Sequence, residues 1–385
     1  MTMVKMLRSH VRFGIPSLWE VRDAEGQLLL ARGGVVENDE QLVALLAHGA
    51  LVNQEDVKVA LAALALASGR TAEPAATDSR APNVSLFGLW DRLFFRLERA
   101  VKGIGEDAGF PARIDELAMN LVQLVERDAD IGIFLSVRQD AHRFGIYGLS
   151  HAVFTAMICF LMSHRMGWPR ERCLLLVKAA LTMNMSVFEL QGRLAAQGVP
   201  MLQEQKNLLE NHPLKSAQML RAAGVTDKEW ITAVEQHHEW IDGSGYPNKL
   251  TEMSEMGKAL KYADVFMAKI SPRAIRQPLT VQEAARQLFK LDGGGPMAMA
   301  IIKEFGIYPP GEVVKLKSGE LAVVIRRTAS ANTPLAVSIT DKGGMPVLNV
   351  VRRETARPEY AITGLVVDKS LVTRVPPERL YGLPS

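Results

Sequence analysis

The sequence predicts a mostly α-helical protein: a helical bundle in the middle, a small N-terminal α+β module and a C-terminal β-hairpin appendage. Three observations support this fold class. Apolar residues recur at helical spacing from Leu86 to about Phe305. A run rich in Ser, Pro, Ala and Thr has the composition of a linker. Alternating apolar residues flank Gly-containing turns after residue 311. The expected parts are a module at 1–67, a linker at 68–84, a helical domain at 85–310 and an appendage at 311–385.

The composition excludes several classes of protein. The 385 residues carry a net charge of only +3, and the basic residues are scattered, so nucleic acid is not an expected partner. The two cysteines, Cys159 and Cys173, lie in apolar helical surroundings and predict buried thiols without a disulfide framework. The N-terminus lacks the apolar region of a signal peptide, and the longest apolar stretch, 152–162, is too short to span a bilayer. We therefore expect a cytoplasmic protein with no membrane span.

The N-terminal module is expected to combine two strands and a helix. Residues 18–21 and 27–30 have strand composition on either side of an Asp-Ala-Glu-Gly turn. Asn38-Asp39 can cap a helix that carries Leu42, Leu45 and Leu46. The module shows no phosphate-acceptor grouping, so the sequence predicts no role for it.

The middle of the chain reads as successive helices, and the last part as hairpins. Cys173 to Leu181 is apolar nearly all round, which predicts a helix at the centre of the bundle. Two alternating runs around Ser318-Gly319 predict a β-hairpin, and residues 335–351 repeat the pattern. The other expected helices are one opened by Pro111, one from His151 to about Pro169, one from Pro213 to Gly224, one over 228–240 and one over 257–270.

The most informative motif is HHEWIDGSGYP, from His237 to Pro247. Imidazoles are the commonest biological metal ligands, and a rigid glycine-built loop beside them suits a metal held next to a phosphate-bearing ligand. The alternative is a surface histidine pair followed by a turn shaped only by its glycines and proline. A partly exposed Tyr246 would be a good contact for a nucleotide base or a partner protein.

These residues resemble the signature of the HD-GYP family, a branch of the HD phosphohydrolases that hydrolyse cyclic di-GMP. The resemblance covers roughly residues 140–310 and includes Tyr147, the His212-Pro213 pair and Ala263-Asp264-Val265-Phe266. It implies the metal ligands His151, His212, His237, His238 and Asp264. It also implies a ligand or partner loop with Arg273 nearby, made of Asp242, Gly243, Ser244, Gly245, Tyr246 and Pro247.

Each implied ligand also has a structural alternative. His151 could be a satisfied core histidine, and His212 could simply lie near a helix N-terminus. Asp264 could pair with Lys258 or Lys261 on a solvated face.

The chain departs from the family pattern at the family's namesake His-Asp pair. The corresponding segment, 179–187, has Met183 and Asn184 in place of that pair and Val187 in place of a lysine. Two lesser departures are Ser216 and Met267. In the family, the aspartate bridges two ions whose shared water is the nucleophile. Asn184 brings no charge, and the thioether of Met183 suits Cu(I) better than harder ions, so Met183 and Met185 are interpreted as core packing.

Three hypotheses follow from a site that keeps the five implied ligands but lacks the His-Asp pair and the lysine. The first is a degenerate HD-GYP protein of a bacterial cyclic di-GMP network that binds or scaffolds, with weak or no hydrolysis. Its partners would be cyclic di-GMP, a diguanylate cyclase or another signalling protein. The second is an active phosphodiesterase with a reduced metal set, and the third is an adaptor with a closed pocket. For the cofactor, the sequence leaves open one divalent ion (Fe, Mn or Zn) or none. Because adjacent helical residues diverge by about 100°, His237 and His238 are expected to address different positions.

Overall fold

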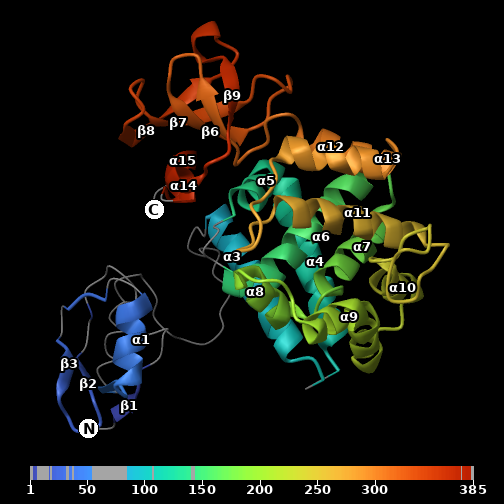
Figure 1. The fold of residues 1–385 in the computed structure, drawn as a ribbon, viewed down its shortest axis with the longest axis horizontal. Coiled ribbons are helices and arrows are strands. Elements are labelled where there is room, and N and C mark those ends of the chain that lie inside the picture. The colour runs from blue at the N-terminus through green and yellow to red at the C-terminus, as the bar shows by residue number, and fades with distance from the viewer. Residues whose placement is uncertain are drawn as a thin grey trace, which may run out of the picture. The chain divides into compact units, whose positions relative to one another are not determined.

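A computed structural model describes residues 3–6, 17, 20–31, 34–36, 39–53, 85–105, 108–139, 144–373 and 375–382 (Figure 1). The chain divides into two compact units, Met1–Ala81 and Pro82–Ser385. The expected linker at 68–84 lies outside the described residues. The predicted fold class is confirmed: helices dominate, with small antiparallel sheets in the N-terminal and C-terminal regions.

The first unit contains a four-stranded antiparallel sheet in the order β1-β4-β2-β3 and one described helix. Val21, Val52 and the helical Leu42 are buried together in its core. The predicted turn is present, because the Asp23 carboxylate accepts a hydrogen bond of 2.7 Å from the Gln27 amide. Leu18 and Trp19 of the first predicted strand lie outside the described residues. The elements are β1 (Met3–Lys5), β2 (Val21–Arg22), β3 (Leu28–Leu30), α1 (Asp39–Ala47) and β4 (Leu51–Asn53).

The second unit is built around α6, in which nearly every residue from Tyr147 to Ser163 is buried. The sequence predicted a buried helix at the centre of the bundle over Cys173–Leu181, which corresponds to α7. The predicted burial of α7 is confirmed, since none of its residues from Cys173 to Leu181 is exposed, although Lys178 on one face reaches Asp115 at 2.9 Å near the surface. The elements are α3 (Leu86–Lys102), α4 (Phe110–Arg127), α5 (Ala129–Arg138), η2 (Phe144–Ile146), α6 (Tyr147–Arg165), α7 (Arg170–Thr182), α8 (Phe188–Ala196), α9 (Gln203–Ala222), α10 (Lys228–Gln236), α11 (Glu255–Ile270), α12 (Val281–Leu291) and α13 (Pro296–Phe305).

Three predicted helix boundaries are corrected. Helix α6 begins at Tyr147, so His151 lies inside it. Helix α9 begins at Gln203, and the Gln205 side chain accepts a hydrogen bond of 2.8 Å from the backbone amide of Leu202 just before it. Pro213, which was expected to begin this helix, lies in its interior. Helix α10 ends at Gln236, before the histidine pair that it was expected to carry.

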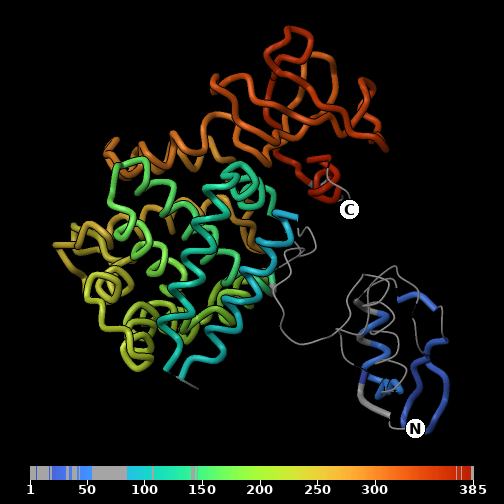
Figure 2. Tube along the Cα trace, turned by 180° about the vertical axis from the view of Figure 1, so that it is seen from behind, coloured from blue at the N-terminus to red at the C-terminus, as the bar shows by residue number. Residues whose placement is uncertain are grey.

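The C-terminal strands form a five-stranded antiparallel sheet in the order β8-β7-β6-β5-β9. In Figure 2 this part of the chain is the orange-to-red end of the trace. Both predicted hairpins are confirmed, with Val314 opposite Ala322 and Val337 opposite Arg352. Val323 and Val337 belong to the same hydrophobic core as the helices. The elements are β5 (Val313–Leu316), β6 (Leu321–Arg326), β7 (Leu335–Thr340), β8 (Pro346–Glu354), η3 (Pro358–Tyr360), β9 (Ile362–Val366), α14 (Ser370–Thr373) and α15 (Pro377–Tyr381).

Two further sequence expectations can be compared with the structure. Cys159 and Cys173 are buried free thiols, as predicted. In the described parts of the chain, no helix combines the length and the apolar character that crossing a bilayer requires.

Candidate functional site: a histidine cluster beside a basic cavity

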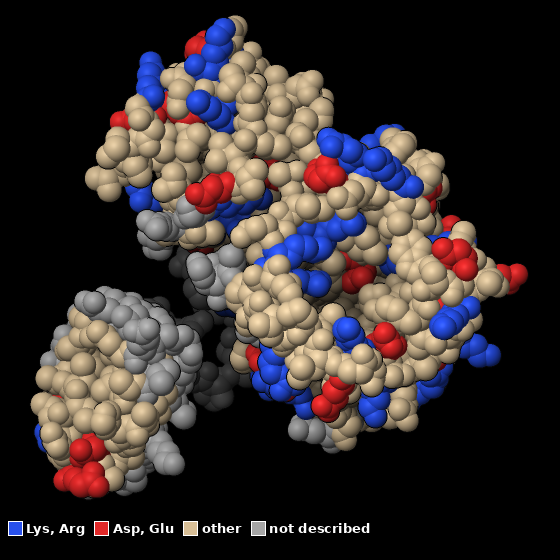
Figure 3. Space-filling model, in the orientation of Figure 1, with Lys and Arg blue, Asp and Glu red and all other residues tan. Residues whose placement is uncertain are grey.

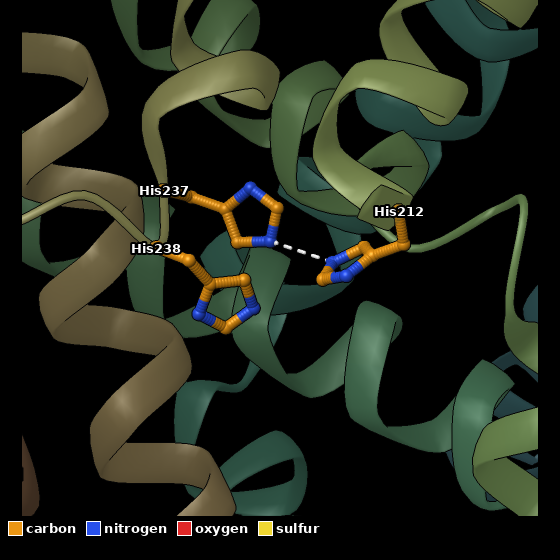
Figure 4. A group of neighbouring side chains, drawn as sticks. All are labelled: His212, His237 and His238. Atoms are coloured by element: carbon orange, nitrogen blue, oxygen red, sulfur yellow. Dashed lines mark hydrogen bonds between the residues drawn. The ribbon is translucent and has the colours of Figure 1, made fainter. Parts of the chain in front are cut away.

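Three of the predicted ligands come together in one cluster. His212 projects from α9, whereas His237 and His238 lie in the turn after α10 (Figure 4). One ring nitrogen of each lies within 4.8 Å of the others. The expectation that His237 and His238 address different positions was wrong. Because α10 ends at Gln236, the pair leaves the helical path, and the two ring centroids are 4.2 Å apart.

Hydrogen bonds to backbone carbonyls determine which ring nitrogen of His212 and of His237 faces the centre of the cluster. Pro213 has no N–H, so the carbonyl of Leu209, four residues earlier, lacks its helical donor. Nδ1 of His212 donates to that carbonyl instead. In the same way, Nδ1 of His237 donates to the carbonyl of Val234 at 2.7 Å. Because both carbonyls can only accept, both neutral rings carry a lone pair on Nε2.

These two lone pairs face each other. The Nε2 atoms of His212 and His237 are 3.1 Å apart, a contact that is repulsive unless a cation lies between them. A proton is a poor candidate at neutral pH, because burial lowers the pKa of His212 to about 3 and lowers the pKa of His237 as well. Two nitrogens bound to one divalent ion at about 2.0–2.1 Å stand roughly 2.9–3.4 Å apart. The donor set therefore fits a metal ion.

The other two predicted ligands form a separate buried pair. Nε2 of His151 on α6 lies 2.6 Å from the carboxylate of Asp264 on α11, and neither residue belongs to the three-histidine group. Burial would raise the pKa of Asp264, but the hydrogen bond and charge of His151 hold that pKa below its ordinary value. The suggested pairing of Asp264 with Lys258 or Lys261 was wrong, since its partner is His151.

Arg273 and Tyr147 support this pair from one side. The Tyr147 ring stacks on His151 with centroids 5.7 Å apart and an interplanar angle of 8°. The Arg273 guanidinium donates two hydrogen bonds to the Tyr147 hydroxyl, at 3.0 and 2.8 Å. Arg273, which the sequence assigned to the ligand loop, therefore also orients the ring that packs on His151.

The Gly-Tyr-Pro loop folds back onto the histidine cluster. The amide of Tyr246 donates to the carbonyl of His238 at 3.2 Å, and the two rings stack with centroids 4.6 Å apart. Gly245 is required here, because a Cβ at this position would lie 2.4 Å from the backbone nitrogen of Trp240. Asp242 and Ser244 are exposed, and the Ser244 hydroxyl donates to the Asp242 carboxylate at 2.6 Å.

Glu239 anchors the loop and was missed from the sequence. Its carboxylate is fully buried and accepts backbone hydrogen bonds from Asn248 at 2.6 Å and from Leu250 at 3.0 Å. The signal that could have revealed it is an acid directly after the histidine pair, followed by a loop whose amides need acceptors.

A cavity of about 240 Å³ opens beside the cluster. His237, His238, Tyr246 and Asp264 line it together with four cationic side chains, and Lys and Arg side chains border a hollow on this face of the molecule (Figure 3). The cations are Lys261, Lys269, Arg273 and Arg276. Such a balance of charge favours an anionic ligand.

The chain is similar to several known proteins. Residues 111–293 match the HD domain family model. A cyclic di-GMP phosphodiesterase of Pseudomonas aeruginosa is 32% identical over 31% of this chain and 30% of its own length. The cyclic di-GMP phosphodiesterase PdeB of Borreliella burgdorferi is 20% identical over 46% of this chain and 48% of its own length. The matches thus span at most about half of these relatives. Bd1817, an HDG"Y"P protein of Bdellovibrio bacteriovorus, shares the fold with a TM-score of 0.50 at 16% identity, over 78% of this chain and 99% of its own.

Residues 111–293 of this chain, just under half of its length, are an HD domain, and the matched relatives together with the motif residues support an HD-GYP protein. The departure of the chain from the family pattern lies in the turn between α7 and α8. Met183 and Met185 are buried members of the hydrophobic core, which confirms their interpretation as packing residues. Asn184 is 1% exposed, and its Oδ1 has no hydrogen-bond partner among the residues that the structure describes. Val187 lines a different cavity, together with Met185.

The segment that departs from the HD-GYP pattern is nevertheless connected to the cluster. The Ser186 hydroxyl donates to the carbonyl of His212 at 3.2 Å and contacts the Ser216 hydroxyl at 2.9 Å. Ser216, one of the lesser departures, therefore ties this turn to α9.

Proposed function

We propose that this HD-GYP protein works in a bacterial cyclic di-GMP network by binding the dinucleotide or a signalling partner, with weak or no hydrolysis. The observation that carries this proposal is the cavity in which His237, His238 and Tyr246 adjoin four cations. Its volume of about 240 Å³ is below the roughly 300–1,000 Å³ of drug-sized ligand sites. The site would therefore take one nucleotide half of the ligand and leave the other half at the surface.

In this proposal the cluster holds one divalent ion, Fe, Mn or Zn. His212, His237 and His238 would supply nitrogen ligands, and the unpartnered oxygen of Asn184 is a further candidate donor. The ion would supply Lewis-acid polarisation of a phosphate oxygen. Asp264 is held ionised by His151 and supplies negative charge at the cavity wall.

We expect weak hydrolysis because the turn between α7 and α8, residues 183–187, contains no charged side chain. Asn184 is neutral and Met183 is packed in the apolar core, so neither offsets the charge of a second ion. Val187 supplies no cation for the phosphate. Electrostatic contributions of that kind are commonly worth about 10²–10³-fold in rate each.

Calorimetry with cyclic di-GMP, alongside a hydrolysis assay on the same sample, tests the proposal. We expect binding without turnover, loss of binding in Tyr246→Ala, and close to one equivalent of metal in protein purified without chelator. A ligand at 100 times its Kd should raise the free energy of unfolding by about 2.7 kcal/mol. An unchanged melting temperature at saturating cyclic di-GMP would exclude the nucleotide-binding role.

A second candidate is an active phosphodiesterase with a reduced metal set. Two buried polar atoms favour it, since Oδ1 of Asn184 and Nδ1 of His151 both lack partners within the described ranges. Turnover with Mn²⁺ or Fe²⁺ that is abolished by His237→Ala would establish this candidate. A closed-pocket adaptor, the third hypothesis, predicts neither metal nor nucleotide binding.

A protein partner would meet the exposed side of the loop. Ile241 is 60% exposed, and Asp242 and Ser244 beside it are also exposed. A diguanylate cyclase domain is the partner we propose for this surface.

A further inference from the structure

Lys261 is a buried cation in the wall of the cavity. It lies on α11, one helical turn before Asp264, and only 3% of it is exposed. Its Nζ donates to the backbone carbonyl of Glu239 at 3.0 Å and lies 3.4 Å from the centroid of the Trp240 ring. No carboxylate in the described part of the chain forms an ion pair with it.

The other three cations of the cavity have partners or are open to solvent. Lys269 donates to the Gln287 side chain at 2.7 Å, and Arg273 is held by the Tyr147 hydroxyl. Arg276 is exposed and donates to the carbonyl of Ala268 at 2.6 Å. Lys261 is thus the buried member of the four, and no side-chain oxygen in the described residues accepts from it.

A buried ammonium group needs compensation. Taking a charge out of water costs several kcal/mol unless it is paired. The Trp240 ring and one carbonyl supply part of that compensation, but an ammonium group has three N–H donors, and the Glu239 carbonyl accepts from only one. Because Lys261 and Asp264 are three residues apart on a helix, they share one face, and both line the cavity.

We propose that Lys261 binds a phosphoryl group of the ligand and supplies the positive charge that Val187 does not. This inference rests on the proposed function, because it assigns a phosphate contact within the same cavity. The chemical class of the ligand is a nucleotide phosphodiester or monoester. The guanidinium groups at the mouth attract the anion, and Lys261 contacts it where water is excluded.

The test compares Lys261→Met and Lys261→Arg with the wild type, using calorimetry with cyclic di-GMP, GMP and inorganic pyrophosphate on the full chain. Lys258→Met is the matched control, because it removes the same charge from the same helix at a residue that does not line the cavity. We expect Lys261→Met to weaken cyclic di-GMP binding about 10- to 100-fold, as the loss of a charge-assisted hydrogen bond does. Lys261→Arg should restore part of the affinity, and Lys258→Met should change it less than threefold.

The outcomes separate this inference from the proposed function. If the wild type and Lys261→Met bind cyclic di-GMP equally, the role of Lys261 is wrong and the binding function stands. If the wild type binds only GMP or pyrophosphate, and Lys261→Met loses that binding, the phosphate contact stands and the cyclic di-GMP assignment falls. If no phosphate compound binds, the role of Lys261 and the nucleotide-binding form of the proposed function are both wrong, and only binding of a protein partner remains. An equal loss in Lys258→Met would also contradict the assignment, since it would reflect net charge alone.

Discussion

At the scale of single residues, the protonation of His212 makes the free energy of unfolding depend on pH. Its pKa is about 3 in the folded protein because of burial and the nearby His237, against about 6.5 when unfolded. Between these two pKa values only the unfolded state binds the proton. The contribution of His212 to the free energy of unfolding is therefore fully present above pH 6.5 and is lost as the pH falls toward 3. At pH 5 the loss is about 2 kcal/mol for this group. Urea unfolding in chelator at pH 7 and pH 5 should show a weaker pH dependence in His212→Gln than in the wild type. Equal pH dependence would contradict this assignment.

Glu239 gives a second prediction at this scale. In Glu239→Gln one of the two carboxylate acceptors becomes an NH₂ group that opposes the amide of Asn248 or Leu250. Leaving a buried donor without an acceptor costs about 1–3 kcal/mol. Urea unfolding should show that loss, and hydrogen exchange should show faster exchange at those two amides. Glu252→Gln, at an exposed position in the same loop, is the control and should change stability by less than about 0.5 kcal/mol.

At the scale of elements, the proline inside helix α9 lowers the stability of the helix but fixes the orientation of the His212 imidazole. Pro213→Ala would restore a backbone donor to the Leu209 carbonyl, and that donor would compete with Nδ1 of His212 for the same oxygen. A helix-interior proline costs about 3 kcal/mol relative to alanine, whereas two buried methylene groups are worth about 1.6 kcal/mol. We therefore expect stability to rise by about 1 kcal/mol while zinc affinity falls, because the imidazole loses its fixed orientation. Calorimetric zinc titration and urea unfolding measure both. A variant with weaker stability, or with unchanged zinc affinity, would contradict the argument.

Helix α9 also illustrates what the sequence could and could not predict. Periodicity predicted α4, α6, α7, α10 and α11 and both C-terminal hairpins, because those patterns are local, whereas α3, α5, α8, α12 and α13 were not predicted individually. The rule that proline begins a helix failed at Pro213, since the imidazole of His212 takes the freed carbonyl. The resemblance to the HD-GYP family implied the three clustered histidines, but their convergence depends on how α9 packs against the end of α10. The sequence suggested a solvated face for Lys261 only as an alternative for Asp264, and it could not show the burial of Lys261, because that burial depends on contact with the Trp240 ring.

At the scale of the whole second unit, Arg327 connects the C-terminal sheet to the helices. Its Nε lies 2.5 Å from the carboxylate of Asp130 on α5, its backbone amide donates to the same carboxylate at 3.1 Å, and its guanidinium donates to the carbonyl of Glu304 on α13. Asp130 is only 8% exposed, so removing the guanidinium leaves a buried carboxylate largely uncompensated. The neighbouring Arg326 pairs with Asp128 but is 54% exposed, and pairs of that kind contribute about 0–1 kcal/mol.

These two arginines test whether sheet and helices unfold together. We expect Arg327→Met to lower the free energy of unfolding by about 2–3 kcal/mol and Arg326→Met by less than about 1 kcal/mol. Because strand residues such as Val323 share one core with the helices, the loss should lower hydrogen-exchange protection equally in β6 and in α6. Faster exchange in β6 alone would mean that the sheet opens as an independent unit. In that case the helices would hold the histidine cluster and the cavity without the sheet, and its contribution to the site would be limited to covering the core.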